Sequence, residues 1–268
     1  SLNVANLPAS SGTGDKALLT ESNSYFEDIQ FQQGGDIGTA TISQTLATQA
    51  DTPQDAALSN DGTKFYEAST TEGEIFQSSL TTPFDVSTAS LDKSILSESQ
   101  SPQGITFNTS GTRFYEMGSG VNIEKIHQFS VSTPFDIGTL TLQKSINTQD
   151  SVPKGLTFGD EGGKLYEIGS SGDKIYQSEL STPFDIGTAS FEKSIPAQEG
   201  APQGIDISQD GTKIYEVGVL TLEIIQSDLT TPFDIATASV TKSIPTEDQI
   251  FPTDVVFANN DLRMYEVG

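Results

Sequence analysis

The stretch Pro202–Ile244 reads PQGIDISQDGTKIYEVGVLTLEIIQSDLTTPFDIATASVTKSI. Nearly the same stretch occurs at Pro153–Ile195, at Pro102–Ile146 and at Pro53–Ile95. Most of the remaining chain is a partial copy of it. An internal repeat of about 50 residues therefore decides the fold.

One copy of the repeat, which starts at Pro102, contains four short stretches that are apolar or partly alternating, as strands are. Gly111 and Pro134 lie between them, and both residue types favour turns. We expect strands, called A to D in chain order, at Gly104–Phe107, Arg113–Met117, Lys125–Val131 and Leu140–Ile146.

Four antiparallel strands in a unit of this length are typical of a β-propeller blade. No stretch longer than a turn or two has apolar residues at helical spacing, which excludes leucine-rich and helical repeats. A tyrosine on strand B recurs every 49 to 51 residues, at Tyr66, Tyr115, Tyr166, Tyr215 and Tyr265.

The fifth copy begins at Pro252 and stops at Gly268, just after its strand B. Patterns typical of strands C and D occur instead near the N-terminus, at Ile29-Gln30-Phe31 and at Ile42–Leu46. An open ring would leave strand edges unpaired. We therefore predict an all-β fold: a five-bladed β-propeller with four-stranded antiparallel blades, its last blade closed by N-terminal strands.

The predicted organisation is an N-terminal arm over residues 1–23 and a single propeller domain over residues 24–268. The arm is polar and fits no repeat, and we expect it to reach a partner subunit. The alternative is that Val4, Leu7 and Leu18-Leu19 fold back onto the ring. The predicted blades are residues 53–101, 102–152, 153–201, 202–251, and 252–268 together with 24–50.

Charge and composition limit the function classes. The chain has 37 acidic and 13 basic residues and a net charge of −24, which argues against binding to nucleic acid or to anionic membrane surfaces. Solubility in salty water and cation binding are two interpretations of this charge. The spread of acidic residues through every loop favours solubility.

The chain has no cysteine, so disulfides and cysteine-based metal sites are excluded. No apolar run approaches the roughly 20 residues that span a bilayer. The beginning, Ser-Leu-Asn-Val, lacks the charged and apolar pattern of a signal segment.

Three polar features recur in register: a Tyr-Glu pair on strand B, a glutamine on strand C and a Thr-Pro-Phe-Asp motif before strand D. A catalytic site needs different groups in different roles, so features present in every blade indicate how a blade is built. We expect the Glu and Gln to pair across strands B and C. We expect the Phe to fill the seam between blades and the Asp to accept hydrogen bonds from the amides that follow it. Five equivalent ligand pockets, as in lectin propellers, are the functional alternative.

Candidate catalytic residues are few. His127 is the only histidine, so a histidine metal cluster is excluded, and a Ser-His-Asp set cannot be assembled from the sequence. Asp55 and Asp254 replace the glycine of the other repeats at the head of strand A, and Asp206 replaces a threonine or an apolar residue. Paired carboxylates at the channel would suit glycoside hydrolysis, and sequence drift explains the substitutions equally well. We predict no catalytic, cofactor-binding or metal-binding residues.

Loop variability points to one face of the ring. The A–B turn and the C–D loop, which share a face, are nearly invariant, whereas the B–C and D–A loops of the opposite face differ among copies. Variable loops on a rigid scaffold are where binding usually occurs. The predicted binding residues are Val219, Leu220, Ile250 and Phe251 on the variable face, together with Asp55, Asp206 and Asp254.

The repeat contains Ser-Pro-Gln-Gly-Ile-Thr-Phe, Gly-Thr-Lys-Ile-Tyr-Glu-Val-Gly and Leu-Thr-Thr-Pro-Phe-Asp-Ile. It resembles a family of tandem propeller repeats that is common in tailed phages, especially marine ones, and in environmental bacterial surface proteins. The resemblance covers residues 25–268. It implies a virion or surface protein and supplies no catalytic residues.

From this resemblance we expect a non-enzymatic virion structural or adhesion module, associated with a phage tail or capsid, that binds protein or glycan and uses no cofactor. The expected partners are other virion or surface subunits and a host-surface glycan, with no nucleic acid and no membrane insertion. The expected location is the virion or the extracellular surface. The alternatives are a lectin-like sugar-binding propeller and a glycoside hydrolase or lyase that uses the channel carboxylates.

Overall fold

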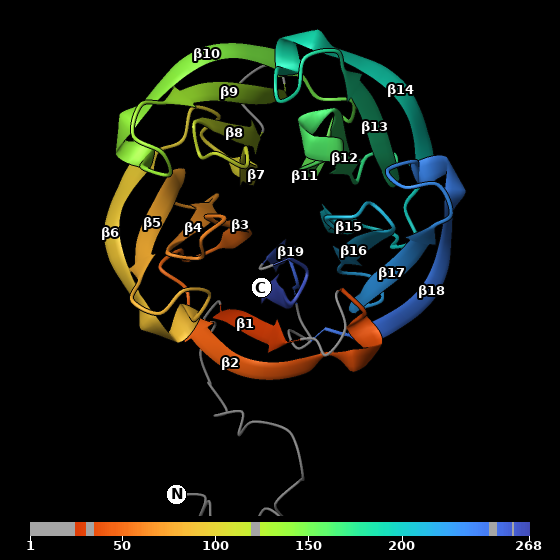
Figure 1. Cartoon of the computed structure of the whole chain (residues 1–268), viewed down its shortest axis with the longest axis horizontal. Coiled ribbons are helices and arrows are strands. Elements are labelled where there is room, and N and C mark those ends of the chain that lie inside the picture. Colours follow the sequence, from red (N-terminus) through yellow and green to blue (C-terminus); the bar gives the residue numbers. More distant parts are fainter. Residues whose placement is uncertain (1–24, 31–34, 119–123, 247–250, 259) are drawn as a thin grey trace, which may run out of the picture.

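The structure, a computed structural model, describes residues 25–30, 35–118, 124–246, 251–258 and 260–268. These residues form five four-stranded antiparallel sheets around a central axis (Figure 1). The prediction of an all-β propeller with four-stranded antiparallel blades is confirmed. The predicted arm, residues 1–23, lies outside the described residues.

Each sheet contributes one strand to every layer of the ring, counted from the axis outward. The innermost strands are β3 (Pro53–Leu58), β7 (Pro102–Phe107), β11 (Pro153–Gly159), β15 (Pro202–Ile207) and β19 (Asp254–Ala258). The second strands are β4 (Lys64–Ser69), β8 (Arg113–Gly118), β12 (Lys164–Gly169), β16 (Lys213–Gly218) and β20 (Arg263–Val267). The third strands are β5 (Glu74–Leu80), β9 (Lys125–Val131), β13 (Lys174–Leu180), β17 (Glu223–Leu229) and β1 (Tyr25–Gln30). The outermost strands are β6 (Ala89–Leu96), β10 (Leu140–Asn147), β14 (Ala189–Pro196), β18 (Ala238–Pro245) and β2 (Thr41–Ala47).

Short 3-10 helices occupy the loops before the outermost strands, and one lies in a turn after an innermost strand. They are η2 (Ile37–Thr39), η3 (Val86–Thr88), η4 (Ile137–Thr139), η5 (Asp160–Gly162), η6 (Ile186–Thr188) and η7 (Ile235–Thr237). Among the described residues, no helix is long and apolar enough to cross a membrane.

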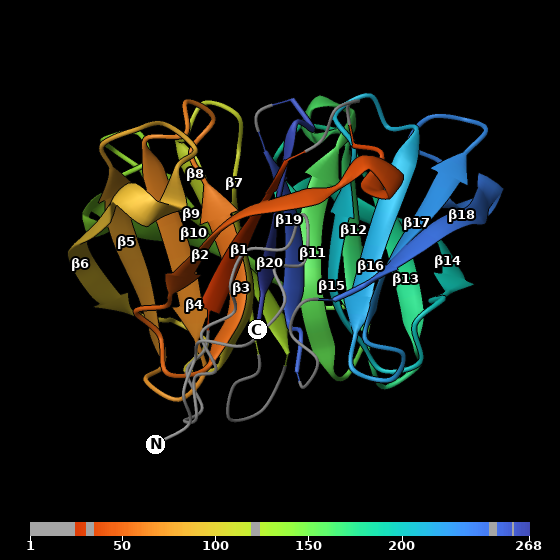
Figure 2. The ribbon, with the colours of Figure 1, turned by 90° about the horizontal axis from the view of Figure 1, so that it is seen from below.

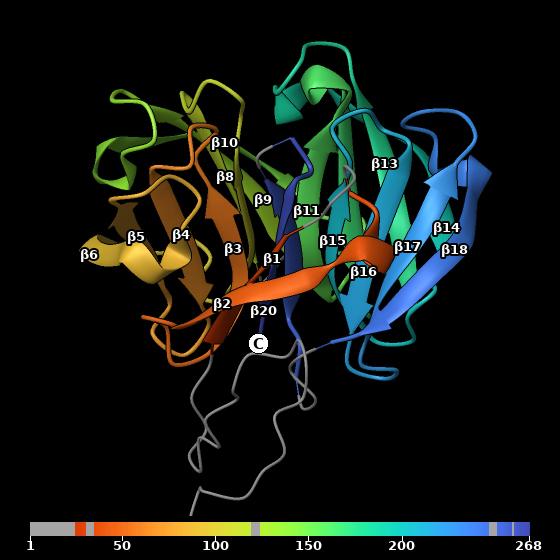
Figure 3. The ribbon, with the colours of Figure 1, turned by 60° about the horizontal axis from the view of Figure 1, so that its bottom comes forward.

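One sheet combines strands from both ends of the chain, in the order β19-β20-β1-β2. In it β1 runs antiparallel to β20, with Phe26 opposite Val267 and Gln30 opposite Arg263. The side views show the sheets standing around the axis with loops at both faces (Figure 2), and β2 on the outside of the ring, between the outer strands β6 and β18 (Figures 1 and 3).

The apolar core lies between neighbouring blades rather than inside one of them. In one cluster, Tyr115, Met117 and Ile126 of the blade built from β7–β10 pack against Leu156 and Leu165 of the next blade. Burial of apolar surface is the main favourable contribution to folding. Each blade is therefore stabilised mainly by its two neighbours.

A buried hydroxyl links every blade to the next one. Each strand-B tyrosine is fully buried, and its hydroxyl donates a hydrogen bond to a carbonyl oxygen in the loop before the outermost strand of the following blade. The five pairs, with O···O distances of 2.5–2.9 Å, are Tyr66–Phe135, Tyr115–Phe184, Tyr166–Phe233, Tyr215–Gly35 and Tyr265–Phe84.

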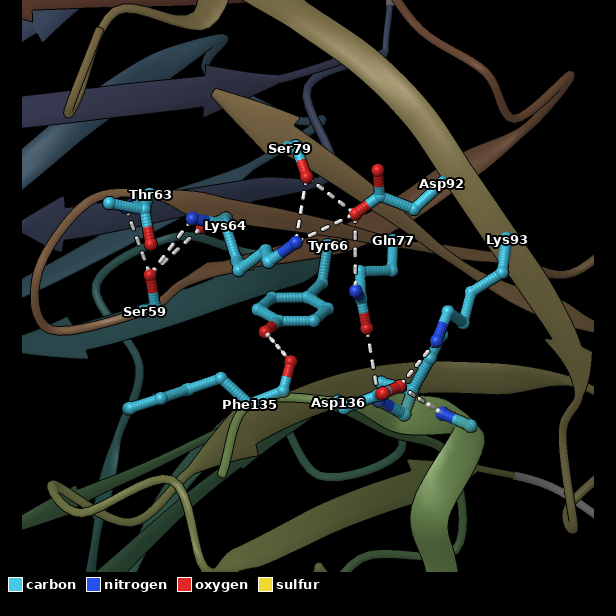
Figure 4. Close-up of polar contacts among 12 residues, drawn as sticks. Ser59, Thr63, Lys64, Tyr66, Gln77, Ser79, Asp92, Lys93, Phe135 and Asp136 are labelled. Atoms are coloured by element: carbon cyan, nitrogen blue, oxygen red, sulfur yellow. Dashed lines mark hydrogen bonds and ion pairs between the residues drawn. The ribbon is translucent and has the colours of Figure 1, made fainter. Parts of the chain in front are cut away.

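The strand-C glutamine and a lysine on the outermost strand reach the same loop, as Figure 4 shows for one seam. The glutamine oxygen accepts the first amide after the aspartate at 3.0–3.2 Å, in the pairs Gln77–Ile137, Gln128–Ile186, Gln177–Ile235 and Gln226–Ile37. The lysine pairs with the aspartate itself, in the pairs Lys93–Asp136, Lys144–Asp185, Lys193–Asp234 and Lys242–Asp36.

The structure corrects the expected Glu–Gln pair. Glu67 lies opposite Phe76, whereas Gln77 lies opposite Tyr66. Since successive side chains of a strand point to opposite faces, the two side chains cannot meet across these strands. The expected aspartate turn is confirmed, because the side chain of Asp85 accepts the amide of Ser87, and the equivalent aspartates do the same.

The phenylalanine of the Thr-Pro-Phe-Asp motif has a left-handed backbone conformation in every blade that contains it. The φ angles of Phe84, Phe135, Phe184 and Phe233 are 59–62°. The predicted seam position is also confirmed, because Phe135 packs against a cluster that contains Tyr66 of the preceding blade. A bulky residue rarely adopts this conformation. Gly35 takes the equivalent place in the sheet made from both chain ends, with φ 65°.

We predict that Tyr166→Phe lowers the free energy of unfolding by about 1–3 kcal/mol, because the buried carbonyl of Phe233 loses its donor. Urea unfolding followed by circular dichroism measures the change. Tyr66→Phe lies in a different seam, so the double variant should lose close to the sum of the two single losses. Unchanged stability in both single variants would contradict the importance of this contact.

Buried strand-B glutamates accept hydrogen bonds from the loops that lead into their blades. The side chain of Glu67 accepts the amide of Gln49 at 2.8 Å, and the side chain of Glu167 accepts the amide of Gln149 at 2.9 Å. Glu216 binds the amide of Gln198 in the same way. Burial raises the pKa of all three carboxyls to about 7.

We predict that the protein loses stability as the pH rises from about 4.5 to about 7. A carboxyl whose pKa is higher in the folded than in the unfolded state binds its proton more tightly when folded, so the free energy of unfolding falls as pH rises through this window. Below it, the lysine-paired aspartates have the opposite effect, because the hydrogen bond from lysine lowers the pKa of Asp136 and of its equivalents. Calorimetric melting temperatures at pH 4.5, 6 and 8 measure the trend.

The triple variant Glu67→Gln, Glu167→Gln, Glu216→Gln is the matched control. It keeps an acceptor oxygen at each position and removes the titration. Its melting temperature should therefore fall less between pH 4.5 and 8 than that of the unaltered chain. An equal fall in both proteins would show that these three glutamates do not cause the trend.

Candidate functional site

A cavity of about 420 Å³ lies on the central axis and is lined by the innermost strands of all the sheets. Asp254 lies at the start of β19, and the exposed turn residues Asn60, Thr109, Gln209 and Asn260 also line the cavity. The cavity therefore opens on the face of the A–B turns.

Two positions of the innermost strands break the repeat. Equivalent residues at the first position are Asp55, Gly104, Gly155, Gly204 and Asp254. Equivalent residues two positions later are Ala57, Thr106, Thr157, Asp206 and Val256. The three carboxylates thus come from three consecutive blades, and the two threonines come from the other two.

Crowding at the axis explains the glycines. A Cβ atom added to Gly104 would lie 2.5 Å from a methyl carbon of Leu156. A Cβ atom added to Gly204 would lie 2.4 Å from a carboxylate oxygen of Asp254. The innermost strands approach so closely here that side chains fit at only some of the equivalent positions.

Asp55 and Asp254 form a buried carboxyl pair that also bridges blades. Asp55 Oδ2 accepts the amide of Ile105 at 2.6 Å, and Asp254 Oδ2 accepts that of Ala56 at 3.5 Å. The two carboxyls share a hydrogen bond, and burial raises the pKa of both, that of Asp55 most strongly. Two adjacent carboxylates cannot readily both ionise, so the pair retains a proton.

Asp206 lies within the cavity wall and contacts both neighbouring blades. Its Oδ1 accepts the hydroxyl of Thr157 and the amide of Ile207, both at 2.8 Å. Its Oδ2 accepts the amide of Phe257 at 2.7 Å. Burial raises its pKa to about 7. This carboxyl therefore exchanges a proton near neutral pH, as a general base must.

Backbone amides also face the axis, because each innermost strand is the edge of its sheet. The amides of Ala56 and Ile105 point inward, as their bonds to the aspartates show. Amide directions alternate along a strand. The N–H groups of Leu58 and Phe107 therefore point toward the axis as well, and both residues line the cavity.

The predicted binding residues fall into two separate groups. Leu220 and Phe251 are 69% and 55% exposed on loops of the variable face, and Val219 is partly exposed beside Leu220. Ile250 lies outside the described residues. Asp55, Asp206 and Asp254 lie at the channel.

The structure does not bring these two groups together, because the cavity opens at the opposite ends of the strands, among the nearly invariant turns. Sequence reasoning found the aspartates through their departure from the repeat. It missed their partners Thr157 and Phe257, whose roles depend on contacts between blades. Among the described residues, no cluster of three or more His, Cys, Asp or Glu side chains could hold a metal ion.

Comparison with known proteins identifies the fold. No protein-family model matches the chain, and no curated protein matches it. Among solved structures, a periplasmic gluconolactonase of Pseudomonas aeruginosa is similar with a TM-score of 0.53 at 11% identity, over 89% of this chain and 74% of that one.

Two further solved structures are similar over comparable lengths. A proposed 6-phosphogluconolactonase of Bacteroides uniformis gives a TM-score of 0.51 at 12% identity, over 92% of this chain and 75% of that one. A protein of unknown function from Desulfotomaculum acetoxidans gives a TM-score of 0.52 at 12% identity, over 91% of this chain and 72% of that one. At these identities the likeness shows the fold alone.

These structures correct the functional expectation. We expected a non-enzymatic virion structural or adhesion module. That expectation was wrong, because the solved structures that share this architecture include proteins named as lactonases. The repeated contacts between blades stabilise the ring and do not indicate the function of the axial cavity. The resemblance to phage repeats stays a prediction.

Proposed function

We propose that the protein is a hydrolase of small neutral lactones and that the axial cavity is its active site. The observation that carries the proposal is the asymmetry of the cavity wall, where Asp206 and Asp254 depart from an otherwise repeated lining and Asp55 lies hydrogen-bonded to Asp254. Catalysis needs different groups around one substrate, and the axial cavity brings together carboxyls of different protonation behaviour.

The cavity favours a small uncharged ring. Its volume of about 420 Å³ lies within the range of small-molecule sites. The described lining contains three aspartates, Asp206, Asp254 and Asp261, and no lysine or arginine. A phosphorylated lactone would lack a cationic partner there. A neutral lactone, the class in the name of the similar gluconolactonase, therefore fits this cavity better than the phosphorylated lactone in the name of the Bacteroides uniformis protein.

The proposed reaction begins when the Asp206 carboxylate takes a proton from water. The resulting hydroxide attacks the lactone carbonyl carbon, and the inward amides of Leu58 and Phe107 stabilise the oxyanion. The ring C–O bond then breaks, and the proton held by the Asp55–Asp254 pair passes from Asp254 to the leaving ring oxygen. The product is the open-chain hydroxy acid, and the proton on Asp206 returns to the Asp55–Asp254 pair, directly or through solvent.

We predict that Asp206→Asn lowers kcat/KM for D-glucono-1,5-lactone by about 10²- to 10⁴-fold, because the general base is lost. A pH-stat assay, corrected for spontaneous hydrolysis, measures the rate. For the unaltered chain kcat/KM should rise with pH through about 7, since the pKa of Asp206 is about 7 and the base acts when ionised.

Asp206→Thr is the matched folding control, because Thr106 and Thr157 occupy the equivalent positions of two other blades. It should fold and still lack activity. Glu192→Gln on the outer strand β14 should leave kcat/KM unchanged. Full activity in Asp206→Asn, or no hydrolysis of any neutral lactone by the unaltered chain, would refute the proposal.

We also propose that the ring is a five-bladed propeller closed by the N-terminal strands. The ladder between β1 and β20 supports this, as do the links from Tyr215 to Gly35 and from Tyr265 to Phe84.

Deletion of residues 1–50 removes β1 and β2, so we expect aggregation or a melting temperature lower by more than 10 °C, read by light scattering and calorimetry. Deletion of residues 1–24 keeps both strands and is the control for shortening the chain. A soluble 51–268 fragment with native thermal stability would contradict closure by these strands.

A further inference from the structure

A line of polar side chains crosses the blade built from β7–β10. His127 on β9 lies directly opposite Glu116 on β8 and directly opposite Ser145 on β10. Three other blades keep the glutamate and the serine but place Phe76, Tyr176 and Ile225 between them. The histidine therefore makes this blade different from those three.

The histidine contacts the serine. His127 Nδ1 lies 2.8 Å from Ser145 Oγ. The imidazole is only 8% exposed, whereas Ser145 is exposed on the outermost strand. Burial lowers the pKa of His127, so the ring is neutral at pH 7 and can accept the hydroxyl proton. A buried base thus holds an accessible hydroxyl.

Glu116 is fixed beside this pair. Its carboxylate accepts the Ser97 hydroxyl and the amide of Ser99, each at 2.7 Å, and the amide of Glu98 at 3.2 Å. The negative charges of Glu116 and Glu98 favour the protonated form of His127. They would therefore stabilise the imidazolium that forms when the serine loses its proton.

A recess of about 440 Å³ lies beside the Glu116 end of this line, and neither His127 nor Ser145 is among its lining residues. Ser97 and Glu98 belong both to the recess and to the surroundings of Glu116. Leu96, which is 78% exposed, adds an apolar side chain to its wall. A polar recess with one exposed apolar side chain suits a short acyl chain.

We propose that Ser145 is the nucleophile of a second hydrolytic site, with His127 as its base and Glu116 as a positioning residue, and that this site takes esters of short-chain acids. Ser145 Oγ attacks the ester carbonyl carbon while its proton moves to His127 Nδ1. The C–O bond to the alcohol breaks, and His127 protonates the leaving alkoxide. Water then attacks the acyl-serine with His127 as base, which releases the acid and restores the serine.

The test uses the full chain with a fluorophosphonate label and with p-nitrophenyl butyrate. Mass spectrometry should place the label on Ser145, and Ser145→Ala should abolish it. His127→Phe should lower the labelling rate and ester turnover by about 10²-fold or more. Phenylalanine is the residue that the blade built from β3–β6 has at the same place, Phe76, so this variant should keep the native melting temperature.

A gain-of-function variant separates chemistry from folding. Phe76→His places a histidine between Glu67 and Ser94, as in the blade of His127, and should make Ser94 reactive.

Glu116→Gln should move the pH midpoint of Ser145 labelling downward, because a charge that favours the imidazolium is lost. Glu98 and Lys125 remain as the other charges that act on the ring. Labelling of Ser145 that is unaffected by His127→Phe, or equal labelling of Ser94 and Ser145 in the unaltered chain, would overturn the proposal.

Discussion

The ring depends on one buried contact, the hydrogen bond from a strand-B tyrosine to a carbonyl of the next blade. The carbonyl belongs to a residue with a left-handed backbone, so the loop must keep an unfavourable conformation for the contact to form. The glutamine and the lysine of the same preceding blade bind the next two residues of this loop. A buried carbonyl without a donor is costly, so the seams favour the closed arrangement over any splayed one.

Crowding at the axis decides where chemistry can arise. Most of the inner positions are filled by small or apolar residues because the strands almost touch there. A carboxylate at such a place loses water, contacts the edge amides of a neighbouring strand and holds its proton more tightly. The same substitution on an outer strand would give an ordinary exposed aspartate. The geometry of the ring, rather than the residue type alone, makes Asp206 suitable as a base.

The sequence predicts the architecture well, because the repeat length, the tyrosine spacing and the strand patterns are local properties. It also identifies Asp55, Asp206 and Asp254 as departures from the repeat. It does not reveal that their carboxylates bind amides of other blades, or that the cavity opens away from the variable loops. The line from Glu116 through His127 to Ser145 was missed for the same reason, since 11 and 18 residues separate its members and only the strand register aligns them.

Each of the four blades built from consecutive strands carries two different halves of its seams. One half is a tyrosine, a glutamine and a lysine that contact the following blade, and the other is a loop that the preceding blade contacts. The joints therefore have a direction, and the ring has a sense of rotation. A gene segment that encodes one such unit contains both halves. Duplicating the segment would supply a complete joint on each side of the new blade, so a propeller of this kind can gain a blade by copying, with no new interface to evolve.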